Sequence, residues 1–190
     1  MSLTKRDIAE RFARLPAEKQ QGFLKVLRTQ GIDFSRLPIV PAPAAERMPV
    51  SHAQARQWFL WQLDRESSAY HIPGGLRLSG PLDLGVLRSS LAALVSRHAG
   101  LRTVFTRRTD GQAEQVVLPA LELDVPLVDL SGEAQAEHLA QAHAKSLVQA
   151  PFDLTAGPLL RVKVIRVGER EHVLVLVMHH IVSDGWSMGV

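Results

Sequence analysis

Two adjacent histidines, His179 and His180, follow the longest apolar run of the chain, and an Asp-Gly pair, Asp184 and Gly185, lies just beyond them. Imidazole is the side chain best suited to accept and return a proton near neutral pH. Glycine lets the backbone fold tightly or approach a ligand closely. This pattern is consistent with a general base delivered to a loop at the end of a buried strand.

Successive side chains of a strand point to opposite faces, so His179 and His180 cannot both face one site while the strand stays regular. One of them is therefore expected to be structural. Three other interpretations of the motif compete with the base on a strand. They are a core or loop histidine with a capping aspartate, a metal site, and a Ser-His-Asp hydrolase.

A metal site would need three or four convergent ligands. The remaining histidines show no paired spacing near the motif, so we expect no metal site. These histidines are His52, His71, His98, His138, His143 and His172. A hydrolase of the Gly-x-Ser-x-Gly type would need its nucleophile elbow, and the sequence contains none.

The strands that position the motif are predicted from periodicity and turn residues. Within residues 172–180, the run 173–178 is apolar throughout, which predicts a central strand covered on both faces. Residues 159–167 alternate apolar with basic side chains, which predicts its partner strand. Residues 101–108 and 113–118 flank the Asp110-Gly111 turn and predict a hairpin.

Helices are predicted between these strands. Asp83 suits the N-cap of a helix that Gly100 ends, with its apolar stripe on Leu84, Leu87, Leu91, Leu94 and Val95. A second helix is predicted over 133–149, before Pro151.

The N-terminal part has a different composition. It predicts two short helices: the first is capped by Thr4, and the second has Pro16 in its first turn, Gly31 as its stop and Phe23, Val26 and Leu27 on one face. Residues 1–35 are thus a helical leader, 36–48 a Pro-rich linker and 49–190 the main domain.

Composition excludes several classes of protein. With 190 residues, 46% of them hydrophobic and 22% charged, the chain is long enough for one substantial core. It has no cysteine, which excludes disulfides and thiolate chemistry, and a cytoplasmic location is expected. No apolar run approaches the roughly 20 residues of a membrane span. The net charge of +3 comes from scattered residues and aromatics are only 5%, so nucleic-acid binding is not expected.

Four stretches together resemble condensation domains of nonribosomal peptide synthetases. In chain order they are "SHAQARQWFLWQL" at 51–63, "RHAGLRTVF" at 97–105, "PFDLTAGPLLR" at 151–161 and "MHHIVSDGWS" at 178–187. The stretch at 70–83, "YHIPGGLRLSGPLD", is similar to the same family, and the leader is similar to segments that precede some bacterial members.

The resemblance implies an α/β fold, an α+β sandwich of the chloramphenicol acetyltransferase type with a central mixed sheet and two lobes. Residues 49–190 correspond to the N-terminal lobe, and the second lobe is expected to be absent, which would leave this chain folded but inactive. In the family, donor and acceptor carrier proteins present phosphopantetheine arms, as substrates, from opposite ends of a tunnel between the lobes. The acceptor amine attacks the donor thioester and an amide bond forms without a directly bound cofactor.

The resemblance also implies roles for individual residues. His180 matches the catalytic histidine, and Gly185 matches a position whose backbone approaches the thioester. His179 is expected to be structural, and Asp184 to organise the motif through an ion pair with an arginine, for which the second lobe is a candidate location. Arg56 is a supporting candidate behind the site.

Other matched positions have structural expectations. Ser51 is predicted as the N-cap of a helix, and Trp58, Phe59 and Trp61 as partly core.

In the second stretch, Arg97 and Arg102 are expected to stabilise the fold. Two residues depart from the family pattern: Ala99 stands where glutamate is usual, and Gln57 where an apolar residue is usual.

The motifs look most like domains that join an L-configured donor to an L-configured acceptor. Two rival functions remain: an acyltransferase of the same superfamily that uses coenzyme A esters, and a non-catalytic module that docks through the helices at 4–30. Apolar residues Trp186, Met188 and Val190 are expected to lie on an exposed face of the lobe and to favour self-association.

Overall fold

The computed structural model describes residues 4–41 and 47–187. The chain divides into two compact units, Met1–Ala45 and Glu46–Val190. Residues 42–46 of the predicted linker lie outside the described residues, so the linker stays a prediction.

The first unit contains the two expected helices, α1 (Lys5–Arg14) and α2 (Ala17–Thr29), followed by the short 3-10 helix η1 (Phe34–Arg36). Thr4 caps α1 in a capping box with Asp7, because each side chain accepts a hydrogen bond from the backbone of the other residue. Pro16 is the N-cap residue of α2, one position before the predicted first turn. Gly31, at a φ of 71°, ends α2 as expected.

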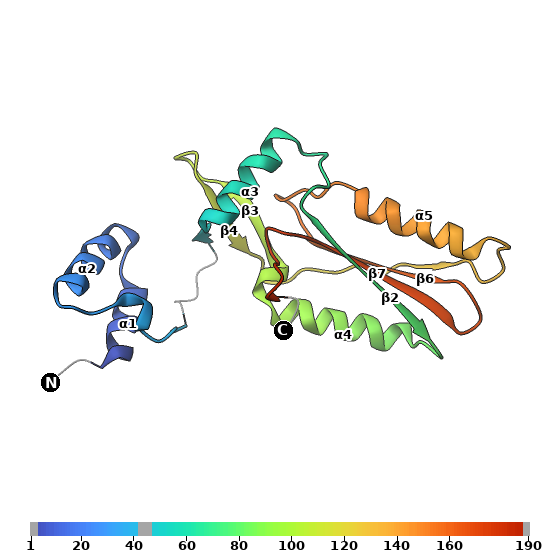
Figure 1. The fold of residues 1–190 in the computed structure, drawn as a ribbon, viewed down its shortest axis with the longest axis horizontal. Coiled ribbons are helices and arrows are strands. Elements are labelled where there is room, and N and C mark those ends of the chain that lie inside the picture. Colours follow the sequence, from blue (N-terminus) through green and yellow to red (C-terminus); the bar gives the residue numbers. More distant parts are fainter. Residues whose placement is uncertain (1–3, 42–46, 188–190) are drawn as a thin grey trace. The chain divides into compact units, whose positions relative to one another are not determined.

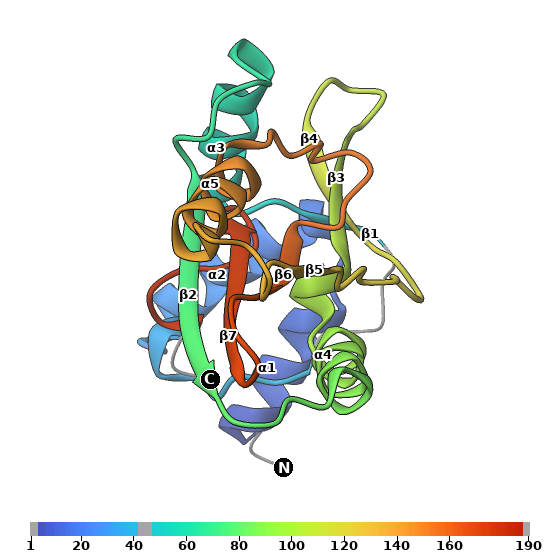
Figure 2. The same ribbon diagram turned by 90° about the vertical axis from the view of Figure 1, so that its right-hand side faces the viewer.

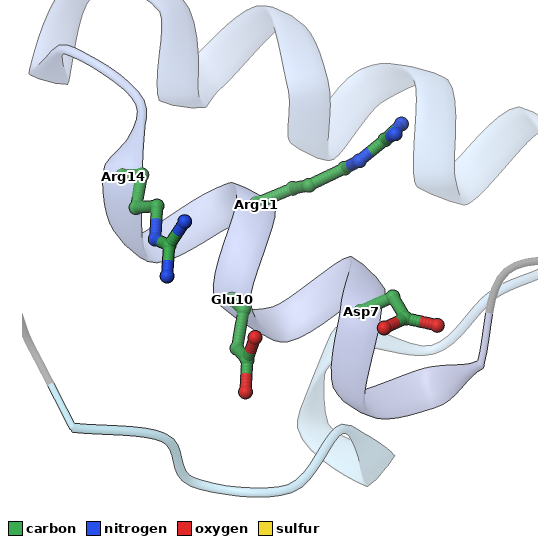
Figure 3. A pocket seen from close by; sticks show the side chains of 4 residues that line it. All are labelled: Asp7, Glu10, Arg11 and Arg14. Carbon is green, nitrogen blue, oxygen red and sulfur yellow. The ribbon is translucent and has the colours of Figure 1, made fainter.

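A small apolar core joins these helices. Leu27 is 3% exposed, whereas Val26 is 51% exposed, so the predicted common face of the two residues was wrong. The ring of Phe12 packs against that of Phe34, with centroids 4.5 Å apart, and against that of Phe23 at 6.1 Å. Charged side chains of α1 line a shallow hollow on this unit (Figure 3); they are Asp7, Glu10, Arg11 and Arg14.

The second unit contains two sheets. The smaller sheet has the order β1-β4-β3, and all its pairs are antiparallel. The hairpin of β3 (Thr103–Arg107) and β4 (Ala113–Val117) confirms the prediction, with Gly111 at a φ of 84° in its turn. The strand β1 (Arg47–Pro49), which pairs with β4, was not predicted.

The larger sheet has the order β2-β7-β6-β5. Its strands are β2 (His71–Ser79), β7 (Glu171–His179), β6 (Leu160–Arg166) and β5 (Leu127–Asp129). The pair β5–β6 is parallel and the others are antiparallel, so the sheet is mixed, as predicted. The apolar strand β7 lies between β2 and β6 and is therefore central.

Both faces of β7 are covered, because its side chains alternate between two apolar clusters. Val175 and Val177 pack in one cluster with Ala140 of α5 (Ala136–Gln149). Leu174 packs in the other cluster with Leu91 of α4 (Leu84–Arg97). Figures 1 and 2 show α4 and α5 on opposite sides of this sheet.

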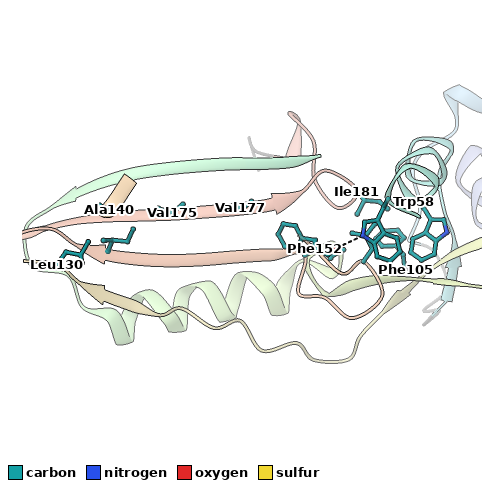
Figure 4. Packing of buried hydrophobic residues seen from close by; sticks show 12 residues of the cluster. Trp58, Phe105, Leu130, Ala140, Phe152, Val175, Val177 and Ile181 are labelled. Atoms are coloured by element: carbon teal, nitrogen blue, oxygen red, sulfur yellow. Dashed lines mark hydrogen bonds between the residues drawn. The ribbon is translucent and has the colours of Figure 1, made fainter. Parts of the chain in front are cut away.

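The aromatic end of the first cluster lies where β7 ends (Figure 4). Trp58 and Trp61 of α3 (His52–Leu63) are buried, and the indole N–H of Trp61 donates a hydrogen bond of 2.9 Å to the carbonyl of Phe152. Phe59, on the same helix, is 57% exposed, so its predicted core position was wrong. A helix residue one place from a buried one points about 100° away from it.

Two of the predicted helices have different ends in the structure. Asp83 caps α4 as expected, but the helix ends at Arg97 and η2 (Ala99–Arg102) follows it. Within the predicted stripe of α4, Leu94 is exposed. The helix α5 begins at Ala136, three residues later than predicted.

Candidate active site

His179, the last residue of β7, lies inside the core and is only 3% exposed. Its Nδ1 accepts a hydrogen bond of 3.1 Å from the backbone N–H of Ile181, so the proton of the neutral ring resides on Nε2. Burial lowers the pKa of His179 to about 4, and the nearby imidazoles of His71 and His180 contribute to this shift. His179 is therefore neutral at physiological pH.

His180, the next residue, has the opposite environment. Its side chain is exposed, while its backbone N–H donates a hydrogen bond of 2.8 Å to the carbonyl of Tyr70. The following residue, Ile181, is buried, and the N–H of Val182 donates to the carbonyl of His179 at 3.1 Å. These hydrogen bonds thus fix the backbone from which the His180 side chain projects, and they leave its ring accessible.

His71 is a neighbour of this site that sequence reasoning missed. It lies opposite His179 in the β2–β7 register, and the two ring centroids are 6.0 Å apart. Its Nδ1 lies 2.6 Å from the carbonyl of Val148 and donates to it, because a carbonyl only accepts. Its Nε2 is buried and has no hydrogen-bond partner among the described residues.

Asp184 lies on the open side of the site and is exposed. Its carboxylate accepts hydrogen bonds from the hydroxyl of Ser187 at 2.7 Å and from its backbone N–H at 2.8 Å. The hydrogen bond from the Ser187 hydroxyl, followed by the one from the Ser187 backbone N–H, lowers the pKa of Asp184 below its usual value. The expected ion pair with an arginine does not occur within residues 4–41 and 47–187.

Gly185 does not have a positive φ, so the turn itself does not require glycine here. A Cβ built at this position would meet no atom within 4 Å. The sequence suggested that Gly185 allows either a tight turn or a close approach of a ligand. The structure shows no tight turn that requires glycine at this position. The space beside Gly185 is open, which leaves its backbone accessible to a ligand.

The first motif reaches the site through Gln54, which matches that motif beside Ser51 and Arg56 and for which the sequence suggested only a place at the start of a helix. Ser51 caps α3 as predicted. Arg56 is exposed, and in the described part of the chain it makes no hydrogen bond or ion pair. Instead, the side-chain amide of Gln54 donates a hydrogen bond of 3.2 Å to the carbonyl of Ile181, one residue after His180.

The two arginines of the second motif differ. Arg102 stabilises the fold as expected, because its guanidinium donates to backbone carbonyls of Val95, Ser96, Leu118 and Pro119. Arg97 is exposed at the end of α4 and, among the residues that the structure describes, shows no such contact.

A hollow of about 280 Å³ lies on the buried side of the site, between the end of α3 and the start of β2. Its lining is Leu60, Trp61, Leu63, Asp64, Ser67, Ala69, Tyr70 and His179. On the other side, Trp186 is 90% exposed, while Met188 and Val190 of the expected apolar face lie outside the described residues.

Neither a metal cluster nor a membrane-spanning helix occurs in the described ranges. Residues 4–41 and 47–187 contain no group of three or more histidine, aspartate or glutamate side chains placed to hold a metal ion. Within the same ranges, no helix has the length and hydropathy needed to cross a membrane.

The geometry has a clear chemical capacity. An accessible imidazole on a fixed backbone lies in the same turn as a glycine with open space beside it. Such an imidazole can accept a proton from, or position, a nucleophile that approaches from the open side.

Comparison with known proteins agrees with this architecture. Residues 44–190 match the family model of the condensation domain. One of the linear gramicidin synthase proteins of Brevibacillus parabrevis is 45% identical over 163 residues, which is 84% of this chain and 2% of that protein. Chondramide synthase of Chondromyces crocatus is 44% identical over 155 residues, 80% of this chain and 4% of that protein.

Solved structures give the same result. The first condensation domain of the calcium-dependent antibiotic synthetase, in complex with a substrate analogue, has a TM-score of 0.70 and 28% identity, and the match covers 76% of this chain and 35% of that one. The starter condensation domain of rhizomide synthetase has a TM-score of 0.70 and 26% identity, with 75% and 36% covered. This chain thus spans about a third of those structures, and the predicted chloramphenicol-acetyltransferase-like α/β fold is confirmed.

Proposed function

This chain belongs to the condensation domain family, and we propose that it supplies the histidine-bearing lobe of a domain that joins a donor acyl thioester to an acceptor amine. The observation that carries the proposal is the placement of His180. Its backbone is held by the carbonyl of Tyr70 at the end of a central strand, and its ring is exposed.

The proposed reaction forms one bond and breaks another. The nitrogen of the acceptor amine attacks the thioester carbonyl carbon, the C–N bond forms, and the C–S bond breaks. The imidazole of His180 accepts a proton from the attacking amine or positions that amine, and the departing thiolate takes up a proton. No redox partner is needed.

The neighbouring residues have supporting roles in this proposal. Gly185 lets the backbone approach the thioester, since the space where a side chain would stand is open. His179 is structural, because it is buried and holds the N–H of Ile181. Asp184 shapes the turn through Ser187.

The proposed substrates are aminoacyl or peptidyl groups on the phosphopantetheine arms of donor and acceptor carrier proteins. The motifs favour an L-configured donor and an L-configured acceptor, in a cytoplasmic peptide synthetase. The relative from Salinispora arenicola that is named a probable non-canonical nonribosomal peptide synthetase supports the peptide synthetase part of this assignment.

We expect the chain alone to be inactive. It spans only 35% of a solved condensation domain. Holding two reactants in the right geometry can lower the activation barrier by about 7 to 11 kcal/mol. One lobe alone cannot hold both reactants, so most of this effect is lost.

A second candidate donor is an acyl coenzyme A. A structure of the rhizomide starter condensation domain carrying an arginine substitution is in complex with C8-CoA, and it matches this chain with a TM-score of 0.66 and 27% identity, covering 71% of this chain and 31% of that one. That complex is a property of the other protein, but it makes a coenzyme A ester a specific alternative here.

The test uses this chain, carrier proteins loaded with donor and acceptor amino acids, and the separately expressed remainder of the domain. Mass spectrometry of the acceptor carrier reads out the product. A dipeptidyl carrier only after the remainder is added supports the proposal. Product from octanoyl coenzyme A but not from the loaded donor carrier supports the second candidate, and carrier binding without any product supports a docking module.

A further inference from the structure

The turn that carries His180 is held at Ile181 from two sides. The backbone N–H of Ile181 donates to Nδ1 of His179 at 3.1 Å, and its carbonyl accepts from Nε2 of Gln54 at 3.2 Å. The side chain of Ile181 is 3% exposed. The residue directly after His180 is therefore fixed through its donor, its acceptor and its side chain.

Gln54 makes this contact from the first turn of α3. Its Oε1 accepts a hydrogen bond of 2.9 Å from the backbone N–H of Ser51, which closes the capping box of the helix. Its Nε2 is then directed to the carbonyl of Ile181, 127 positions further along the chain. One side chain thus links the start of a helix to the turn after β7.

The same amide also reaches the smaller sheet. Nε2 of Gln54 lies 3.4 Å from Oε1 of Gln115 on β4, and Nε2 of Gln115 donates to the carbonyl of Pro49 at 3.0 Å. The orientation of both amides is settled by their partners, because each oxygen faces a donor and each nitrogen faces a carbonyl. The turn after His180 is therefore tied to α3 and, through Gln115, to the hairpin.

We infer that Gln54 is a positioning residue for the amide-forming reaction: it holds the carbonyl of Ile181 and so fixes where the His180 imidazole stands. This inference rests on the proposed function for its catalytic consequence, and on the hydrogen bonds alone for its structural part.

The decisive substitution is Gln54→Glu. Glutamate at this helix position still accepts the N–H of Ser51, so the cap of α3 is kept. At pH 7.5 its carboxylate has no proton to donate, and it faces two oxygen atoms, those of Ile181 and Gln115. The matched control is Ser51→Ala, which loses the side-chain cap but keeps the Gln54–Ile181 hydrogen bond.

The first readout is hydrogen exchange in this chain over residues 180–187. With Gln54→Glu, exchange at the amides of His180, Ile181 and Val182 should become about three- to tenfold faster, the effect of losing one hydrogen bond. Ser51→Ala should leave these rates within about twofold of the parent, since it removes no bond to the turn. Lowering the pH until the new carboxyl group is protonated should restore the parent rates, measured against the parent at the same pH, since a protonated carboxyl can donate.

The second readout is the condensation rate in the complete domain. Gln54→Glu should lower kcat at least about tenfold and leave KM for the two carriers unchanged, because the binding surfaces are intact and the imidazole is displaced. Ser51→Ala should keep kcat within about twofold of the parent value.

The two readouts separate the two claims. If Gln54→Glu speeds hydrogen exchange but the complete parent domain condenses no substrate, the proposed function is wrong while the structural role of Gln54 is supported. Unchanged exchange, or an equal loss of kcat with Ser51→Ala, would overturn the inference.

Discussion

His179 and His180, at the end of β7, lie in different environments. On one side, His179 lies in the core beside His71 and Phe152, and burial keeps its ring neutral. On the other side, the ring of His180 is exposed and the turn that follows carries the exposed Asp184. Of two imidazoles on consecutive residues, one is thus buried in the protein core and the other is exposed to water.

This difference gives the two histidines different surroundings, because one ring lies in the core and the other is open to solvent. The buried imidazole stabilises the turn by accepting the N–H of Ile181. The exposed imidazole has a fixed backbone and remains open to solvent. Substitutions on the two sides should therefore have different consequences.

The largest expected effect concerns the open side. His180→Ala in the complete domain should lower the rate of amide formation by about 10²- to 10⁴-fold, the usual cost of removing a general base. Its melting temperature should not change, because the side chain is exposed. His138→Ala, at an exposed position of α5, is the matched control and should leave both quantities unchanged.

The next effect is the pH dependence of stability on the buried side. The pKa of His179 is lowered from 6.5 to about 4 on folding, so the unfolded chain binds more protons between these values. Stability should therefore be full above pH 6.5 and fall as the pH decreases toward 4, with a loss of about 3 kcal/mol from this group. Urea unfolding at a series of pH values measures the slope.

His179→Gln supplies the control for that titration, since glutamine does not ionise. Its stability should depend less on pH across the same window. An identical slope in the parent and the variant would show that His179 is not the buried group that titrates.

Removal of the buried ring at constant pH should have a smaller effect. His179→Ala leaves the N–H of Ile181 without its acceptor, and such an unpaired group costs about 1 to 3 kcal/mol of unfolding free energy. Denaturant unfolding at pH 7.5 measures the loss. Unchanged stability together with an abolished rate would place His179 in the chemistry instead.

The smallest expected effect is a gain. Oε1 of Gln57 is buried and has no hydrogen-bond partner among the described residues, at a position where the motif usually has an apolar side chain. Gln57→Leu should raise the unfolding free energy by about 1 kcal/mol, since it removes an unpaired polar atom. Arg56→Leu, at the adjacent exposed position, should change stability by less than about 0.5 kcal/mol. A destabilised Gln57→Leu variant would show that the amide has a partner.

Local sequence signals predicted much of the fold. The caps at Thr4, Ser51 and Asp83 and the hairpin turn at Gly111 are all where the sequence placed them, because each depends on a few neighbouring residues. The central position of β7 followed from its continuous apolar run.

Long-range pairing was not predictable in the same way. The strand β2 contains Pro73, Gly74 and Gly75, which obscure the alternation that would identify it. Its register with β7 places His71 against His179, and no local pattern specifies that contact. The hydrogen bond from Gln54 to Ile181 was missed too, because the place of Gln54 at the start of a helix already accounts for that residue locally.

The most direct test of the division between the two histidines is chemical labelling of this chain with diethyl pyrocarbonate at pH 7. Tandem mass spectrometry of the peptide that contains both residues separates the modification of His179 from that of His180. His180 should be labelled rapidly, while His179 should be labelled only as the chain unfolds, because this residue is only 3% exposed. Equal labelling of the two rings in the folded chain, or faster labelling of His179, would contradict the division on which the proposed function rests.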